Sequence, residues 1–130
     1  MSNTYNIGTS TEQIKLAVDI TTVGLAASRA SVLIVNDNQP GIPVAHSVDA
    51  TGDISNQSIG NGAFLQGKRI TVFTKVALIG DNRDERETEV QTIRGSYRLL
   101  GGNGGVKYYN EPILSYQDPS VYVIMVIDLL

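Results

Sequence analysis

The sequence predicts an all-β protein, an antiparallel β-sandwich of jelly-roll-like form with about eight strands. Three observations lead to this fold class. Apolar and polar residues alternate with period two in several stretches, which is typical of strands that bury one face. Turn signals made of glycine, proline and asparagine separate these stretches at short intervals. Apolar residues with helical spacing do not extend beyond about two turns anywhere in the chain.

The chain is long enough for one domain with a substantial core. At 130 residues it should bury about two-thirds of the surface that the unfolded chain exposes. We expect residues 12–130 to form a single sandwich domain. Residues 1–11 are polar, and we expect an N-terminal arm that is either loose or laid on a neighbour. Because chain termini are usually untethered, the loose arm is the default expectation.

The first half of the chain contains the simpler strand signals. Residues 12–23 alternate apolar and polar side chains, as a strand with one wet face does. Residues 24–29 are rich in alanine but too short for an independent helix, so a connecting turn is expected there. Residues 30–36 contain a continuous apolar run, which is typical of a buried strand. Short strands follow at residues 42–48, an edge strand because it contains a proline, and at residues 54–59.

The longest alternating stretch predicts a central β-hairpin over residues 68–100. Its first arm has an isoleucine, valine, threonine or leucine at every second position from Ile70 to Leu78. A polar turn at residues 80–85 follows, and then a second arm rich in threonine, valine, isoleucine and tyrosine. The apolar residues of both arms share one face only if the second arm contains one residue that has no partner on the first arm. A β-bulge is therefore expected near residues 91–92.

The end of the chain holds two more strand signals, at residues 106–110 and 121–130. The second stretch is apolar on both of its faces, and Asp128 is its one charged residue. A strand of this composition needs cover on both faces. On an open edge it would promote aggregation. We therefore expect it either at the centre of a sheet with another layer over it or against a partner chain.

The predicted hairpin separates charge along its length. Its stem carries lysine and arginine without acids, whereas its tip is dominated by acids. If the tip of one copy contacts the stem of the next, this head-to-tail contact repeats into rings or filaments. The candidate interface residues are Arg69, Phe73, Lys75, Arg94 and Arg98 on the stem, and Asp81, Asp84, Glu85, Glu87 and Glu89 at the tip.

The residue inventory favours no catalytic, cofactor or metal site. The chain has no cysteine, which excludes disulfides, thiol nucleophiles and zinc–cysteine centres. Its single histidine, His46, would have to be the base of a serine triad, but the chain has no G-x-S-x-G motif to carry the nucleophilic serine. The acids of residues 81–85 lack the spacing of an EF-hand, and two neighbouring arginines would repel Ca²⁺. The glycines of residues 101–105 lack the Gly-Lys-Ser/Thr of a phosphate-binding loop.

Net charge and hydropathy narrow the range of partners. The net charge of −3 argues against general binding to nucleic acid or to anionic membranes. The first residues lack a basic segment and an apolar run, so a cleaved signal peptide is not expected. No apolar stretch approaches the roughly 18 residues of a membrane helix. We expect the protein to be synthesised in the cytoplasm. It can then become part of a virion or of an extracellular assembly.

These observations favour a non-enzymatic structural protein that assembles with copies of itself. Small cysteine-free β-sandwiches build homo-oligomeric rings, shells and filaments, such as phage-like particles, injection devices and surface appendages, and this is an analogy at the level of fold. The alternative is a β-sandwich module that binds carbohydrate or another ligand. Its candidate ligand residues are Tyr108, Tyr109 and Tyr116, whose rings would have to gather around an open groove.

Overall fold

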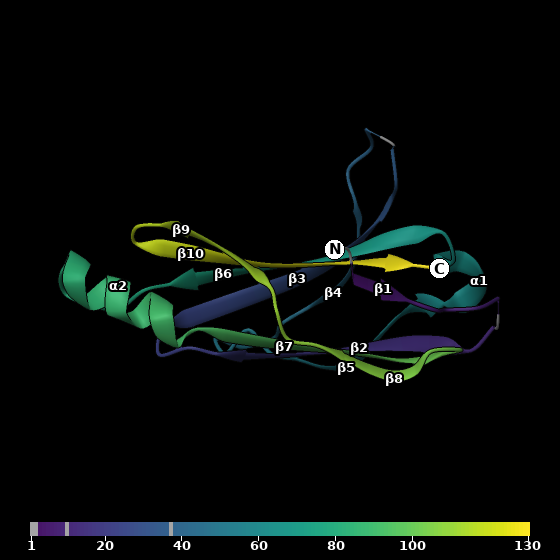
Figure 1. Cartoon of the computed structure of the whole chain (residues 1–130), viewed down its shortest axis with the longest axis horizontal. Helices are drawn as coiled ribbons and strands as arrows, with labels where there is room; N and C mark the ends of the chain where they lie inside the picture. The colour runs from purple at the N-terminus through teal and green to yellow at the C-terminus, as the bar shows by residue number, and fades with distance from the viewer. Residues whose placement is uncertain (1–2, 10, 37) are drawn as a thin grey trace.

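Two β-sheets stacked face to face form the protein in the computed structural model, which describes residues 3–9, 11–36 and 38–130 (Figure 1). Over these residues the chain forms ten strands and two helices. The six-stranded sheet contains β1 (Asn3–Tyr5), β10 (Ser120–Leu129), β6 (Lys68–Ala77), β3 (Leu25–Ile34) and β4 (Ile42–His46) in that order, with β9 (Ile113–Gln117) also paired to β10. The four-stranded sheet has the order β5 (Ile54–Asn61), β2 (Gln13–Thr21), β7 (Arg94–Gly102) and β8 (Gly105–Tyr109).

The predicted fold class, an all-β antiparallel sandwich, is confirmed. Ten strands are present in the described part of the chain rather than about eight, because β1 and β9 were not expected as strands. All strand pairs are antiparallel except that β1 runs parallel to β10. Short α1 (Gly62–Leu65) follows β5, and α2 (Arg83–Thr92) lies at the opposite end of the sandwich (Figure 1).

The core lies between the two sheets and follows the period-two pattern. In β2, Ile14, Leu16 and Val18 are nearly inaccessible to solvent while the residues between them face outward. In β10, Val123 and Ile127 are fully buried in the same way. Because both inner faces are aliphatic, their burial provides the main driving force that holds the two sheets together.

The C-terminal strand β10 has a central position, as expected. Strand β6 pairs with it along one edge. The other edge is shared by two strands, β9 along its first half and β1 along its second half. The four-stranded sheet covers the inner face of β10, but in the described part of the chain no further layer covers its outer face (Figure 1).

The predicted central hairpin over residues 68–100 is wrong. Strand β6 belongs to the six-stranded sheet and pairs with β3 and β10, whereas β7 belongs to the four-stranded sheet. The residues between them form α2, which crosses from one layer to the other (Figure 1). The β-bulge expected near residues 91–92 is also absent, because those residues lie in the last turn of α2.

Local sequence explains why residues 83–92 are helical. The side chain of Asn82 accepts a hydrogen bond from the backbone N–H of Glu85, at 2.9 Å, and so caps the first turn. Asp84 and Glu85 in that turn interact favourably with the helix dipole. Arg83 and Glu87 form an ion pair four residues apart. These signals outweigh the strand-like alternation of threonine and valine in the same stretch.

The N-terminal segment is not a loose arm over its described residues. Strand β1 extends the six-stranded sheet, and Tyr5 and Ile7 are fully buried in the core. The Tyr5 hydroxyl donates to the carbonyl of Gly105 and accepts from the N–H of Gly102, so it joins this segment to the β7–β8 turn. Residues 3–7 therefore belong to the sandwich itself.

The alanine-rich residues 24–29 are not a connecting turn, since Leu25 begins β3 and the strand continues through them. Small residues are needed here because Ala26 and Ser28 face the core. The Ser28 hydroxyl is 2.6 Å from the hydroxyl of Thr74 on β6 and donates to the carbonyl of Gly52. A buried hydroxyl pair thus replaces an apolar contact at this point of the sheet.

Candidate interaction surface

The outer face of the six-stranded sheet carries a row of apolar side chains. Strand register places Phe73 of β6 directly beside Ile124 of β10, and Ile124 beside Ile113 of β9. Tyr122 lies two residues before Ile124 on the same face of β10. Its ring centroid is 5.2 Å from that of Phe73. Val126 continues the series along β10. We call these residues the apolar band: Phe73, Ile113, Tyr122, Ile124 and Val126.

The apolar band is open to solvent and slightly hollowed. Phe73 is 40% exposed and Ile113 is 65% exposed. A hollow of about 310 Å³ lies over the band and is lined by Phe73, Ser115, Gln117, Tyr122 and Ile124. An outer sheet face that meets only water normally carries polar residues at these positions. Here these positions carry aromatic and aliphatic side chains instead.

Two cations border the apolar band. Register places Arg29 of β3 directly beside Phe73, and Lys75 of β6 directly beside Tyr122. Both side chains are exposed, and within the described residues neither is held in an ion pair. Arg69 lies further along β6, but its guanidinium is 2.6 Å from the carboxylate of Asp128. That hydrogen bond raises the pKa of Arg69.

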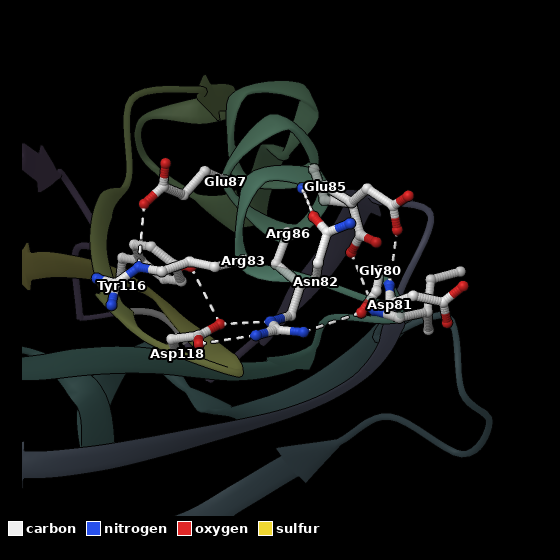
Figure 2. Close-up of polar contacts among 11 residues, drawn as sticks. Gly80, Asp81, Asn82, Arg83, Glu85, Arg86, Glu87, Tyr116 and Asp118 are labelled. Carbon is white, nitrogen blue, oxygen red and sulfur yellow. Dashed lines mark hydrogen bonds and ion pairs between the residues drawn. The ribbon is translucent and has the colours of Figure 1, made fainter.

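The acids expected at a hairpin tip lie instead on α2 and in the segment before it (Figure 2). We call residues 79–92 the acidic end. The carboxylates of Glu85 and Glu89 accept hydrogen bonds from the backbone N–H groups of Asp81 and Ile79, at 2.7 and 3.0 Å. The helix contains no buried residue, so these polar contacts, rather than apolar burial, hold its first turns in place.

An ion pair fastens α2 to the turn between β9 and β10. The guanidinium of Arg86 donates to both carboxylate oxygens of Asp118, at 2.6 and 3.1 Å, and also to the carbonyl of Gly80 (Figure 2). The Tyr116 hydroxyl donates to the same carboxylate. The hydrogen bond from Arg86 lowers the pKa of Asp118, and partial desolvation raises the pKa of Tyr116. A bidentate pair of this kind fixes orientation.

Two carboxylates of the acidic end lack the contacts that the others make. Asp81 and Asp84 are exposed, and within the described residues no partner is found for either carboxylate. By contrast, Glu87 is 3.2 Å from Arg83. The hydrophobic residue next to this segment, Ile79, is 58% exposed. The acidic end therefore presents an isoleucine together with unpaired negative charge.

The structure divides the predicted basic stem between the two sheets. Arg69, Phe73 and Lys75 lie on the outer face of the six-stranded sheet, as their alternation in β6 implies. Arg94 instead donates to the carbonyls of Gln91 and Ile93 at the end of α2, at 2.9 and 2.8 Å. Arg98 lies on the outer face of the four-stranded sheet. These residues separate because β6 and β7 belong to different layers.

Arg98 lines a hollow on the four-stranded sheet that combines charged and apolar side chains. Its guanidinium donates to the side chain of Asn56 on β5, and register places it beside Tyr108 on β8. The hollow has a volume of about 230 Å³ and also includes Asp19 and Ser96. This face therefore differs in character from the apolar band on the opposite side of the molecule.

The three tyrosines of the alternative ligand site do not surround one groove. Tyr109 is 6% exposed, and its hydroxyl donates to the carbonyl of Thr4. Its burial raises its pKa to about 12. Tyr108 points outward and is 63% exposed. These two tyrosines line a polar hollow of about 250 Å³ that includes Lys107, but Tyr116 lies elsewhere, beside Asp118.

A further hollow lies between β4 and β5. It measures about 340 Å³ and is lined by His46, Asp49 and Asp53 among others. Both aspartates already act as local hydrogen-bond acceptors: Asp49 from the backbone and hydroxyl of Thr51, and Asp53 from the N–H of Ile20. The hydrogen bond from the Thr51 hydroxyl lowers the pKa of Asp49. These carboxylates therefore have structural roles in their own loop.

Among the residues that the structure describes, no group of three or more histidine, aspartate or glutamate side chains is arranged to hold a metal ion. In the same residues, neither helix has the length and apolar character needed to cross a bilayer.

Sequence reasoning missed several residues of this surface. Ile113 was not expected in a strand, and Arg29 was expected in a turn. Ile124 and Tyr122 had a usable signal, because three successive outward positions of the last strand, Tyr122, Ile124 and Val126, are apolar or aromatic. Asp118 had no such signal, since its partner Arg86 is 32 residues away in sequence.

Comparison of the chain with protein-family models, with curated proteins and with solved structures found no match.

Proposed function

We propose that this protein is a non-enzymatic structural component that assembles head-to-tail with copies of itself into a homo-oligomeric ring, shell or filament. The observation that carries the proposal is the apolar band across the outer face of the six-stranded sheet. This band is formed by Phe73, Tyr122, Ile124 and their neighbours, and no segment of the described chain covers it.

Burial of the apolar band supplies the driving force for association. Removing apolar surface from water contributes about 25 cal/mol per Å² before the losses of rigid-body and side-chain freedom are subtracted. Aromatic residues with arginine beside them are enriched at protein interfaces. Phe73, with Tyr122 against its ring and Arg29 in the neighbouring strand, is a group of this kind.

Charge determines which mode of association is favoured. In a two-fold dimer that joined two apolar bands face to face, Arg29 and Lys75 of one copy would approach the cations of the other. Like charges brought together in an interface are unfavourable. A contact between two different surfaces avoids this repulsion, and it repeats into rings or filaments.

The test is the native mass of the protein, measured by sedimentation velocity over a range of concentrations. The wild type should form species larger than a dimer, and Phe73→Ser or Ile124→Ser should shift the population to monomer. Val106→Ser is the matched control, because Val106 is 59% exposed but lies on β8 in the other sheet. A wild type that stays monomeric at every concentration would remove the proposal.

A ligand-binding module remains the second candidate function, but fewer observations favour it. Tyr108 and Tyr109 line one hollow with Lys107, whereas carbohydrate sites usually stack sugars on several exposed aromatic rings. A glycan array is the direct check. Binding that is lost in Tyr108→Ala and kept in Phe73→Ser would favour the module over the assembly.

A further inference from the structure

We propose that the acidic end of one copy docks on the apolar band of the next copy, so that Asp81 and Asp84 meet Arg29 and Lys75. This inference rests on the proposed self-assembly and names the two surfaces that form its contact. It replaces the contact between hairpin tip and hairpin stem that the sequence predicted. That hairpin does not form, because β6 and β7 lie in different sheets.

Complementary charge is the first argument for this pair of surfaces. Residues 81–92 contain five acids, Asp81, Asp84, Glu85, Glu87 and Glu89, and two arginines, which gives 2 − 5 = −3. The neighbouring cations of the apolar band, Arg29 and Lys75, have no ion-pair partner within the described residues. Opposite potentials steer two such surfaces together and fix their register.

The second argument is that the acids proposed to bind are the ones without internal contacts. Glu85 and Glu89 accept backbone hydrogen bonds, and Glu87 is paired with Arg83. Binding of a partner through those three carboxylates would compete with contacts that hold α2. Asp81 and Asp84 can bind a cation of another copy without such a loss.

The third argument concerns apolar contact, since exposed ion pairs alone contribute little to affinity. Ile79 lies two residues before Asp81 and is 58% exposed. Its own backbone N–H is bound to Glu89, so the residue is held against α2 rather than left in a free loop. The apolar band offers Phe73 and Ile124 as a site for this side chain. Each surface therefore combines apolar residues with charge of one sign.

The dimensions of the two surfaces agree. A helix of ten residues such as α2 is about 15 Å long. Strands in a sheet lie about 4.8 Å apart, so the width from β3 across β6 and β10 to β9 is also about 15 Å. The helix stands at one end of the sandwich (Figure 1), whereas the apolar band lies on the outer face of the six-stranded sheet. One copy can therefore use both surfaces at once, and the contact continues from copy to copy.

The experiment uses two charge-reversed forms of the full chain. The face variant carries Arg29→Glu and Lys75→Glu, and the end variant carries Asp81→Lys and Asp84→Lys. Each variant alone would bring like charges together at the proposed contact, so the concentration needed for assembly should rise about tenfold or more in either one. An equal mixture restores opposite charges at every contact, because each end then meets a face of opposite sign. We expect the mixture to assemble within about threefold of the wild-type concentration.

Matched controls and thermal melts make the outcomes decisive. Lys15→Glu reverses a charge on the outer face of the four-stranded sheet and should leave assembly unchanged. Melting curves show whether a variant is folded. If the lysines destabilise α2, Asp81→Asn with Asp84→Asn replaces the end variant where it is measured alone, and Asp81→Lys by itself replaces it in the mixture.

Each result separates the inference from the proposed function. If the wild type assembles and the folded end variant assembles equally well, the inference is overturned while self-assembly stands. If the mixture of folded variants fails to assemble, the two surfaces do not contact each other and the inference is again overturned. If the wild type does not assemble at all, both proposals fall together.

Discussion

The outer faces of the two sheets differ, although their inner faces are built alike. On the central strands of the four-stranded sheet, the outward positions include Asp19, Ser96 and Arg98. On the central strands of the six-stranded sheet, the outward positions include Phe73, Tyr122 and Ile124 beside Thr71 and Lys75. Both sheets contribute side chains to the same core. The outer faces therefore differ more than the inner faces do.

The largest effect should come from comparing the two faces of β10. Ile127 is fully buried, so Ile127→Ala leaves a cavity and should lower the free energy of unfolding by about 2–5 kcal/mol. Ile124→Ala on the outer face should lower it by less than about 1 kcal/mol. Chemical denaturation of the dilute monomer measures both. A large loss in Ile124→Ala would mean that the outer face stabilises the fold itself.

A charge placed on each outer face should sharpen the comparison. Ile124→Lys replaces a central apolar side chain of the apolar band by a charged one whose desolvation is costly, and should raise the concentration needed for assembly about tenfold or more. Ser96→Lys places the same charge on the central strand β7 of the other sheet and should change this concentration less than about twofold. Light scattering against concentration gives both values. Equal effects of the two substitutions would show that both outer faces take part in assembly to the same extent.

A smaller effect should follow from loosening the acidic end. Asn82→Ala removes the side-chain acceptor that caps α2, which should destabilise the helix by about 1 kcal/mol. Because α2 buries no residue of its own, faster amide hydrogen exchange should be confined to residues 83–92. Asn82→Asp keeps an acceptor at the cap and serves as the control. Exchange that rises throughout β6 and β7 as well would show that α2 and the sandwich unfold together.

The smallest effect concerns pH and the link between α2 and the β9–β10 turn. The hydrogen bond from Arg86 lowers the pKa of Asp118, so the folded state binds this proton more weakly than the unfolded state. The stabilisation is therefore present above the unfolded-state pKa of about 3.9 and is lost as pH falls through the lower folded value.

Melting temperatures of the wild type and of Asp118→Asn provide the measurement. The wild type should melt higher by a constant amount from about pH 7 to about pH 5, and the gap should close below about pH 4. Arg86→Gln removes the partner and should abolish the same pH dependence. A gap that persists unchanged in strong acid would contradict the role of this carboxylate.

Alternation of apolar and polar residues was sufficient to predict the fold class and most strands, because period two reports which side chains face inward. It also placed Arg69, Phe73 and Lys75 on one outer face, where the structure has them. The same pattern failed at residues 87–92, where threonine and valine alternate as in a strand. There the asparagine cap and the arginine–glutamate spacing favour a helix.

Strand pairing could not be predicted from the pattern, since alternation shows which face a residue occupies but not which strand lies beside it. Only the three-dimensional arrangement assigns β6 and β7 to different sheets, separates Arg94 and Arg98 from Lys75, and brings Asp118 to Arg86. It also places Ile113, Ile124 and Phe73 side by side, although the first and last are 40 residues apart in sequence. These contacts depend on the order of strands across the sheet, which is set by the packing of the whole chain rather than by any short stretch of it.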